Sequence, residues 1–241
     1  MQLLKPRIVD KIIFSENLFL LVLENLSTEP LSPGQFFAIK VIDSFSPLLR
    51  RPFSIFDTQK ENISFLIQVK GKGTKLLKDK KIGDALDILG PLGKPYLSIE
   101  TPFLIAGGTG IAPLNFYARF NKIKGALWGL RTKPNPRLVE LIKNNIPALE
   151  ITTEDGSSGR KGLVTDYIPL NHKNYLVCGP TPMIEKILQI LPEERTWVSL
   201  EGMMGCGFGV CMGCAVKKKR EPGYYRICTE GPLFRADSIM I

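Results

Sequence analysis

The sequence is poor in histidine and has no long apolar run. His172 is the only histidine among 241 residues, and a surface turn is its expected place. No stretch approaches the roughly 18 consecutive apolar residues that span a bilayer. The N-terminal residues MQLLKPRIVD also lack an apolar core followed by a small-residue cleavage site. These absences predict a protein without a membrane span or a secretory leader, and therefore a cytoplasmic location.

The positive charge is large but dispersed. Lysine and arginine outnumber Asp and Glu by 32 to 23, which gives a formal net charge of +9. A charge of this size brings nucleic acid, an anionic cofactor and an acidic partner protein into consideration. The one dense basic run is Lys217-Lys218-Lys219-Arg220, and so short a run is typical of a solvated turn. The pattern therefore disfavours nucleic-acid binding.

The apolar residues divide the chain into three segments. Residues 1–99 contain short apolar or alternating runs separated by Pro- and Gly-rich turns, which predict a small, closed or nearly closed antiparallel β-barrel with one short helix at GTKLLKDK. In residues 100–200, apolar strands alternate with amphipathic helices, and this indicates a Rossmann-like, parallel, doubly wound sheet. Residues 201–241, rich in cysteine and glycine, are expected to form a small third module with a hairpin.

Four of the five cysteines lie in the third segment. Cys206, Cys211, Cys214 and Cys228 follow the spacing C-x4-C-x2-C-x13-C, which is typical of a plant-type 2Fe–2S cluster. The glycines between them would let backbone N–H groups face the sulfurs. In a reducing compartment, clustered cysteines indicate metal ligands rather than disulfides. A structural zinc site also takes four cysteines, and the spacing leaves that alternative open.

Two motifs in the first segment suggest a dinucleotide site. In RPFSI, Arg51 offers a planar charged fork for a pyrophosphate and Ser54 a hydroxyl for a flavin ring nitrogen. In VKGKGT, Gly71 and Gly73 allow close backbone approach, and Thr74 is expected as the N-cap of the short helix, whose start would hold phosphate oxygens. Each motif alone is also typical of an ordinary turn, but their order before a nucleotide-type sheet favours FAD.

Glycines at two strand ends of the second segment suggest a nicotinamide nucleotide. FLIAGGTGIAPL places Gly107, Gly108 and Gly110 directly after a strand, with Pro113 expected to open the next helix. This is a variant of the glycine-rich phosphate turn. YLVCGP ends a later strand with Cys178-Gly179-Pro180 at the same sheet edge. Cys178 is expected to be small and mostly buried near the nicotinamide, because no histidine is present to activate it as a nucleophile.

The nucleotide preference stays open in the sequence. The acidic pair in TTEDGSSGRKG, residues 152–162, suits ribose hydroxyls but equally suits an ordinary capped turn. Arg131, which ends the second strand of the expected sheet, suits the 2′-phosphate of NADPH or simple exposure.

Together these motifs resemble those of the ferredoxin reductase-like flavoproteins, and among them the electron transfer subunit of the heteromeric, NAD-linked dihydroorotate dehydrogenase. The resemblance covers essentially the whole chain and is carried by EGMMGCGFGVCMGCAV with RICTEGPLF, by EDGSSGRKGLVTD, and by RRPFSIF followed by GKGT. It implies a 2Fe–2S cluster on the four cysteines. It also implies FAD held by Arg51, Pro52, Phe53, Ser54, Leu66, Ile67, Gln68, Gly73 and Thr74. Gln68 stands where such proteins often have a basic residue. Phe53 stands where they often have a smaller aliphatic residue, but its ring should still pack beside the isoalloxazine.

The resemblance also implies a role and a partner. Electrons would pass from FMN on a separate catalytic subunit through the cluster and FAD to NAD⁺, in pyrimidine (UMP) biosynthesis, within a heterotetramer of two copies of each subunit. A flavin is needed because nicotinamide exchanges two electrons and the cluster accepts one. No motif for dihydroorotate or FMN chemistry is present, so no catalytic residue is assigned. The alternatives are a flavin and iron–sulfur subunit of a hydrogenase, sulfide dehydrogenase or ferredoxin:NADP oxidoreductase, and a zinc-stabilised binding module.

Overall fold

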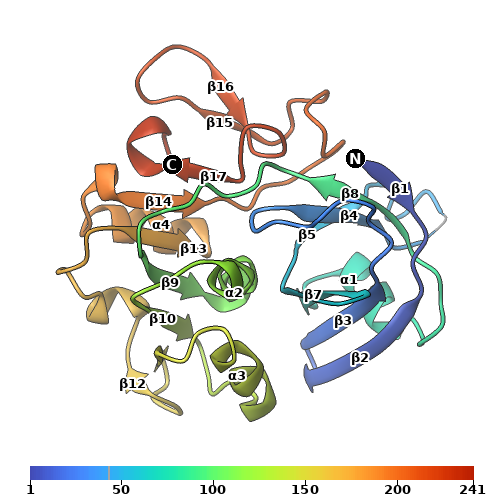
Figure 1. Cartoon of the computed structure of the whole chain (residues 1–241), viewed down its shortest axis with the longest axis horizontal. Coiled ribbons are helices and arrows are strands. Elements are labelled where there is room, and N and C mark those ends of the chain that lie inside the picture. The colour runs from blue at the N-terminus through green and yellow to red at the C-terminus, as the bar shows by residue number, and fades with distance from the viewer. Residues whose placement is uncertain (43) are drawn as a thin grey trace.

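Two antiparallel sheets form the N-terminal part of the molecule (Figure 1). The computed structural model describes residues 1–42 and 44–241. One sheet has the order β1 (Gln2–Leu4), β8 (Asp87–Leu92), β4 (Phe36–Lys40), β5 (Arg51–Ser54), and the other β2 (Ile8–Ser15), β3 (Leu18–Glu24), β7 (Asn62–Gln68), β6 (Asp57–Gln59). One helix, α1 (Lys72–Asp79), follows β7. The predicted antiparallel architecture is confirmed, with the strands hydrogen-bonded as two four-stranded sheets around one core. We call this part the β-domain.

Strands β3 and β7 of the β-domain are apolar on both faces because both of their faces are covered. Phe65 and Ile67 of β7 point into the core between the two sheets. Leu66, between them in sequence, packs instead with residues of the following domain. This explains why β3 and β7 are nearly continuous apolar runs rather than clean alternations.

A seven-stranded sheet forms the second part. Its order is β12 (Arg160–Lys161), β11 (Leu149–Thr153), β10 (Gly125–Leu130), β9 (Phe103–Gly107), β13 (Tyr175–Cys178), β14 (Thr196–Ser199), β17 (Leu233–Arg235). All neighbours pair in parallel except β14 and β17. The helices are α2 (Ile111–Phe120), α3 (Pro136–Lys143) and α4 (Thr181–Leu188), with short 3-10 turns η1 (Gly108–Gly110), η2 (Val164–Tyr167), η3 (Glu193–Arg195) and η4 (Ala236–Ser238). The predicted doubly wound sheet is confirmed, and its strand order reverses between β9 and β13, where such sheets bind ligands.

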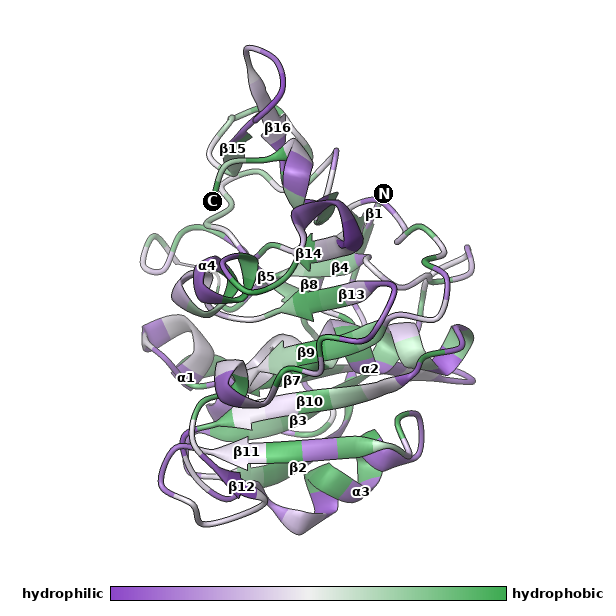
Figure 2. Ribbon diagram, turned by 90° about the vertical axis from the view of Figure 1, so that its left-hand side faces the viewer, coloured by the Kyte–Doolittle hydropathy of each residue, from purple (hydrophilic) through white to green (hydrophobic). Residues whose placement is uncertain are grey.

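The C-terminal residues are less separate than the sequence suggests. The predicted hairpin is present as β15 (Ala215–Lys217) and β16 (Tyr224–Arg226), and it stands out from the molecule with a hydrophilic tip (Figure 2). However, β17 lies beyond the hairpin in sequence and pairs with β14 of the large sheet. The last segment is therefore built into the second domain.

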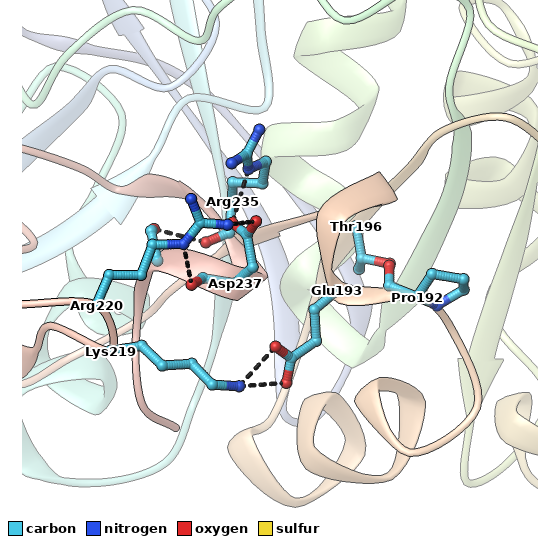
Figure 3. A network of polar contacts seen from close by, with 8 residues as sticks. Pro192, Glu193, Thr196, Lys219, Arg220, Arg235 and Asp237 are labelled. Carbon is cyan, nitrogen blue, oxygen red and sulfur yellow. Dashed lines mark hydrogen bonds and ion pairs between the residues drawn. The ribbon is translucent and has the colours of Figure 1, made fainter.

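The basic run at the hairpin is paired with carboxylates. Lys218 contacts Glu221 at 2.7 Å between Nζ and Oε1, and Lys219 contacts Glu193 at 2.7 Å between the same atom types. Arg220 pairs with Asp237, which also accepts from Arg235 (Figure 3). Three of the four basic side chains thus lie in local ion pairs, as expected of a surface turn. Within the described ranges no helix combines the length and apolar character that crossing a membrane requires.

Candidate functional site

A cavity of about 990 Å³ lies between the β-domain and the carboxyl edge of the parallel sheet. The β-domain contributes Leu66, Gln68 and Lys70 to its wall. The second domain contributes Gly107, Gly108, Thr109, Arg131, Glu154, Pro180 and Met183, among others. Its size is at the upper end of ordinary ligand sites. The cavity therefore joins residues that the sequence assigned to two different nucleotides.

The two glycine motifs of the second domain meet at the switch between β9 and β13. A Cβ at Gly110 would lie 2.3 Å from the Cys178 carbonyl oxygen, and one at Gly179 would lie 3.0 Å from the Gly107 nitrogen. Gly108 has a φ of +53° and open space where a side chain would be, and its carbonyl accepts from Trp128 Nε1 at 2.9 Å. Backbone N–H groups can thus approach a ligand closely at this edge.

The helix after β9 begins earlier than predicted. The 3-10 turn η1 starts at Gly108 and runs directly into α2, so Pro113 stands in the third position of α2 rather than opening it. The difference moves the helical N–H groups closer to the end of β9 and to the cavity.

Cys178 is fully buried, and burial raises the pKa of its thiol well above the ordinary value, with nearby Glu201 acting in the same direction. It is therefore a neutral packing residue, as predicted. Pro180 lines the cavity beside it, whereas Cys178 and Gly179 contact the glycine turn behind the cavity wall.

The two acidic residues of the polar loop after β11, Glu154 and Asp155, have different surroundings. Glu154 lines the cavity. Asp155 instead accepts from the Ser157 hydroxyl at 2.6 Å and the Ser157 N–H at 2.9 Å, and these contacts lower its pKa. Arg131 and Lys133 line the cavity nearby. His172 lies in a surface turn and stacks on Phe103, with ring centroids 4.6 Å apart.

Arg51 and Gly73, both assigned to the flavin, are in contact. A Cβ at Gly73 would lie 2.7 Å from Arg51 Nε, so the guanidinium rests on the first turn of α1. That turn contains no acidic residue. The predicted N-cap was wrong: the N-cap is Gly71, and Thr74 accepts from the Lys70 and Gly71 N–H groups at 3.0 and 3.2 Å from inside the helix. A glycine can thus stand at the N-cap, while a threonine inside the first turn accepts hydrogen bonds from the N–H groups that precede the helix.

The remaining flavin candidates differ in what they present. Leu66 and Gln68 face the cavity, but the Ile67 side chain is buried in the β-domain core, so only its backbone is available to a ligand. Phe53 is half-buried and packs with one side on that core. Pro52 and Ser54 are also half-buried on β5.

Tyr96, Ser199 and Glu201 form a polar group that sequence reasoning missed. The Tyr96 hydroxyl donates to Ser199 Oγ. Burial raises the Tyr96 pKa well above its usual value, and Cys178 and then Glu201 act in the same direction, against the Ser199 hydrogen bond. Glu201 follows β14 at an exposed position and acts on Tyr96 and Cys178 electrostatically. No local spacing joins these residues, so the sequence carried no signal for them.

The four cysteines of the third segment form two pairs of free thiols. In the outer pair, the Cys206 N–H lies 3.4 Å from Cys211 Sγ and the Cys211 N–H lies 3.5 Å from Cys206 Sγ. In the inner pair, Cys214 Sγ lies 3.2 Å from Cys228 Sγ. Cys211 is exposed, whereas both members of the inner pair are buried in the apolar core.

The surroundings of the loop shift the pKa values of two of these thiols in opposite directions. Burial alone would raise the pKa of Cys206, but the N–H groups of Cys211, Phe208 and Val210 together with the Cys211 side chain lower it to about 6. Burial and then Cys214 raise the pKa of Cys228 to about 12. At Gly205 a Cβ would lie 3.1 Å from Cys211 Sγ, so a side chain there would press on the thiol.

The chemistry of this donor set suits a two-iron cluster. Each iron of a 2Fe–2S core takes two protein ligands, and the thiols lie two by two. A single zinc would instead need all four donors around one point.

Comparisons with known proteins agree on one family. Residues 201–240 match the family described as the iron-sulfur cluster binding domain of dihydroorotate dehydrogenase B. The dihydroorotate dehydrogenase B (NAD(+)) electron transfer subunit homolog of Aquifex aeolicus (strain VF5) is 34% identical, over 99% of this chain and 98% of that protein. The electron transfer subunit of the same enzyme from Fusobacterium nucleatum subsp. nucleatum is 37% identical, over 90% of each.

Solved structures share the fold. A chain of an NADH-dependent reduced ferredoxin-NADP oxidoreductase superposes with a TM-score of 0.84 and 29% identity, covering 98% of this chain and 89% of that one. The flavohem-like FAD/NAD binding domain of nitric oxide dioxygenase from Vibrio cholerae superposes with a TM-score of 0.68 at 16% identity, covering 83% and 98%. The second likeness concerns the fold alone.

Proposed function

The chain belongs to the family of electron transfer subunits of dihydroorotate dehydrogenase B, and we propose that it carries electrons from a catalytic dihydroorotate-oxidising subunit through a 2Fe–2S cluster and FAD to NAD⁺. The places of the candidate residues on either side of the β-domain support the proposal. The cavity at the parallel sheet edge borders β7 of the β-domain. On another side, the cysteine loop, residues 205–214, reaches the β-domain where Gly207 meets Leu92 of β8.

The residues divide by the group they would hold. Arg51 and the first turn of α1 would hold the FAD pyrophosphate, because a permanent guanidinium charge and unpaired helical N–H groups both attract phosphate. Pro52, Phe53, Ser54, Leu66, Gln68 and the backbone of Ile67 would line the flavin. Gly107, Gly108 and Gly110 would hold the NAD pyrophosphate, with Cys178, Gly179 and Pro180 behind the nicotinamide. Cys206, Cys211, Cys214 and Cys228 would hold the iron.

The chain's own residues would hold the groups that carry the electrons. We assign none of the described residues as an acid or base for dihydroorotate. When bound, FAD supplies the exchange between hydride and single electrons. The buried, neutral Cys178 thiol keeps charge away from the inner end of the cavity. The N–H groups of the cysteine loop favour ionised sulfur, which is the form that binds iron.

The partner follows from the role of an electron transfer subunit. The catalytic subunit would dock over the cysteine loop, where Met203 is 91% exposed, Val210 75%, Met212 48% and Phe208 44%. Apolar side chains this exposed around an accessible cysteine are typical of a buried interface in a complex. We propose a cytoplasmic heterotetramer of two copies of each subunit, with 1–99, 100–200 and 201–241 as the functional division of this chain.

One purification tests the proposal. The chain isolated anaerobically is expected to show flavin absorption at about 450 nm, with two iron atoms and two acid-labile sulfides per chain. The partner captured from native extract is expected to form orotate when supplied with dihydroorotate and NAD⁺. A colourless chain with one zinc would contradict the cofactor assignment.

A second role is supported by one comparison. The ferredoxin-NADP oxidoreductase chain covers 98% of this chain with a TM-score of 0.84, so a subunit of that kind of complex is the alternative. Capture of a ferredoxin-oxidising subunit, with no orotate formation, would favour it.

A further inference from the structure

The middle of the cysteine loop is held by an arginine from the hairpin. Arg226 ends β16, and one of its terminal nitrogens donates to the Gly209 carbonyl at 3.0 Å. Gly209 lies three residues after Cys206 and two before Cys211. The Arg226 side chain of the hairpin thus fixes the backbone of the loop between the two cysteines of the outer pair.

Glu230 holds Arg226 in place. Glu230 Oε2 accepts from the Arg226 N–H at 2.6 Å and from Nε at 3.1 Å, and Oε1 accepts from the other terminal nitrogen. The Thr229 hydroxyl donates to the same carboxylate at 3.0 Å. This pairing lowers the pKa of Glu230 to about 2 and raises that of Arg226. The contacts with Glu230 and Gly209 together fix the orientation of the guanidinium.

Gly209 is constrained on its other side as well. Its φ is +88°, and a Cβ there would lie 2.8 Å from Thr229 Cγ2 and 3.3 Å from the Arg226 terminal nitrogen. Its N–H acts on the Cys228 thiol in the direction that lowers the pKa of that thiol. One residue therefore joins Arg226, through its carbonyl, to Cys228 of the inner pair, through its N–H.

The positive charge lies beside the inner pair. Arg226 pairs across the hairpin with Ala215, the residue after Cys214, and the N–H of Ile227, between Arg226 and Cys228, donates to the Cys214 carbonyl at 3.0 Å. Glu230 contacts Arg226 and Thr229. Reducing an iron–sulfur cluster adds one negative charge, and hydrogen bonds and charge around the sulfurs set its potential. A guanidinium at this place would stabilise the reduced form more than the oxidised form.

We propose that Arg226, oriented by Glu230, is a positioning residue for the cluster: it fixes the Gly209 carbonyl and raises the reduction potential through its charge. The inference deepens the proposed function and rests on it for the potential. The contact with Gly209 concerns this chain alone.

The test compares Arg226→Met, Arg226→Lys and Glu230→Gln with the wild-type chain, and uses Arg220→Met as the matched control. Arg220 lies in the same hairpin and pairs with Asp237, away from the loop. The cluster potential is measured by a redox titration followed by electron paramagnetic resonance. Iron release to a chelator is measured in parallel.

The variants are expected to separate charge from geometry. Arg226→Met lowers the reduction equilibrium constant about tenfold, which is about 59 mV for a one-electron couple, and speeds iron release. Arg226→Lys keeps most of the potential but releases iron faster, because an ammonium lacks the fork. Glu230→Gln raises the potential, and Arg220→Met changes neither quantity. Equal potentials in wild type and Arg226→Met, or shifts of the same sign in Arg226→Met and Glu230→Gln, overturn the charge effect.

A second measurement separates this inference from the proposed function. Amide hydrogen exchange of residues 205–213 is compared in full-length wild type and Arg226→Met, each freed of metal. Faster exchange in the variant supports the contact with Gly209, and equal exchange overturns it. A wild-type chain with no reducible cluster contradicts the proposed function and the potential effect, while the exchange result still decides the contact.

Discussion

At the scale of single residues, glycine is required where a Cβ would strike a group that the site needs. Gly73 leaves room for the Arg51 guanidinium, and Gly110 leaves room for the Cys178 carbonyl. Neither role depends on positive φ; the requirement is space. Each glycine is therefore needed for the room that it leaves to a neighbouring residue, and not for its own backbone conformation.

Gly73→Ala is expected to weaken FAD binding at least tenfold. The added Cβ would lie 2.7 Å from Arg51 Nε, and a displaced guanidinium loses a charged hydrogen bond worth about 2 kcal/mol. FAD affinity is measured by fluorescence titration of the deflavinated chain. Asp79→Ala, at an exposed position at the end of the same helix, is the matched control. Equal affinities of the two variants would show that Arg51 does not need this space.

Residues linked by short spacing were predictable, and residues linked only through the fold were not. The cysteine cluster and the two glycine turns could be predicted because each follows a short local spacing in the sequence. Tyr96 and Ser199 are 103 positions apart, and no pattern within either strand or loop indicates their contact. Thr74 was misplaced because a capping threonine looks the same in sequence whether it precedes the helix or stands in its first turn.

At the scale of elements, β17 shows how a short strand escapes sequence reasoning. Three residues, Leu233–Arg235, are too few for an alternating pattern to identify a strand. Its place is decided by the unpaired edge of β14, which only the assembled sheet presents. The hairpin and the doubly wound sheet, by contrast, follow from turn residues and from repeated strand-helix alternation.

Phe234→Ala is expected to lower the free energy of unfolding by about 3 kcal/mol and to speed iron loss. Phe234 is 6% exposed, and its ring lies 5.4 Å from that of Tyr225 in the hairpin. Truncation would loosen the hairpin from the sheet. Denaturant titration and chelator release measure the two effects. Met240→Ala, at a 49% exposed position, serves as control, and an unchanged iron-release rate in Phe234→Ala would contradict the expectation.

At the scale of the whole molecule, one apolar core joins the three segments. Phe36 and Leu92 of the β-domain, Ile105 and Val177 of the large sheet, and the inner cysteines belong to one buried cluster. The interface is also polar: the buried Asn115 donates to the Phe56 carbonyl at 3.0 Å, and Arg119 pairs with Asp57 at 2.6 Å.

Met203→Asp is expected to weaken association with the catalytic subunit at least tenfold and to leave flavin and iron content unchanged. Met203 is 91% exposed next to the cysteine loop, and a carboxylate buried in an interface loses hydration without gaining a partner. Size-exclusion chromatography with the purified partner measures association. Ile82→Asp, at a 63% exposed position in the turn after α1, is the control. Unaltered association of Met203→Asp would place the interface elsewhere.

The shared core also bears on how electrons move. Segments that pack into one interior cannot swing independently, so the spacing between flavin and iron is set once, when the chain folds. The rate of transfer between them should then be insensitive to solvent viscosity, in contrast to carriers that travel on a tether.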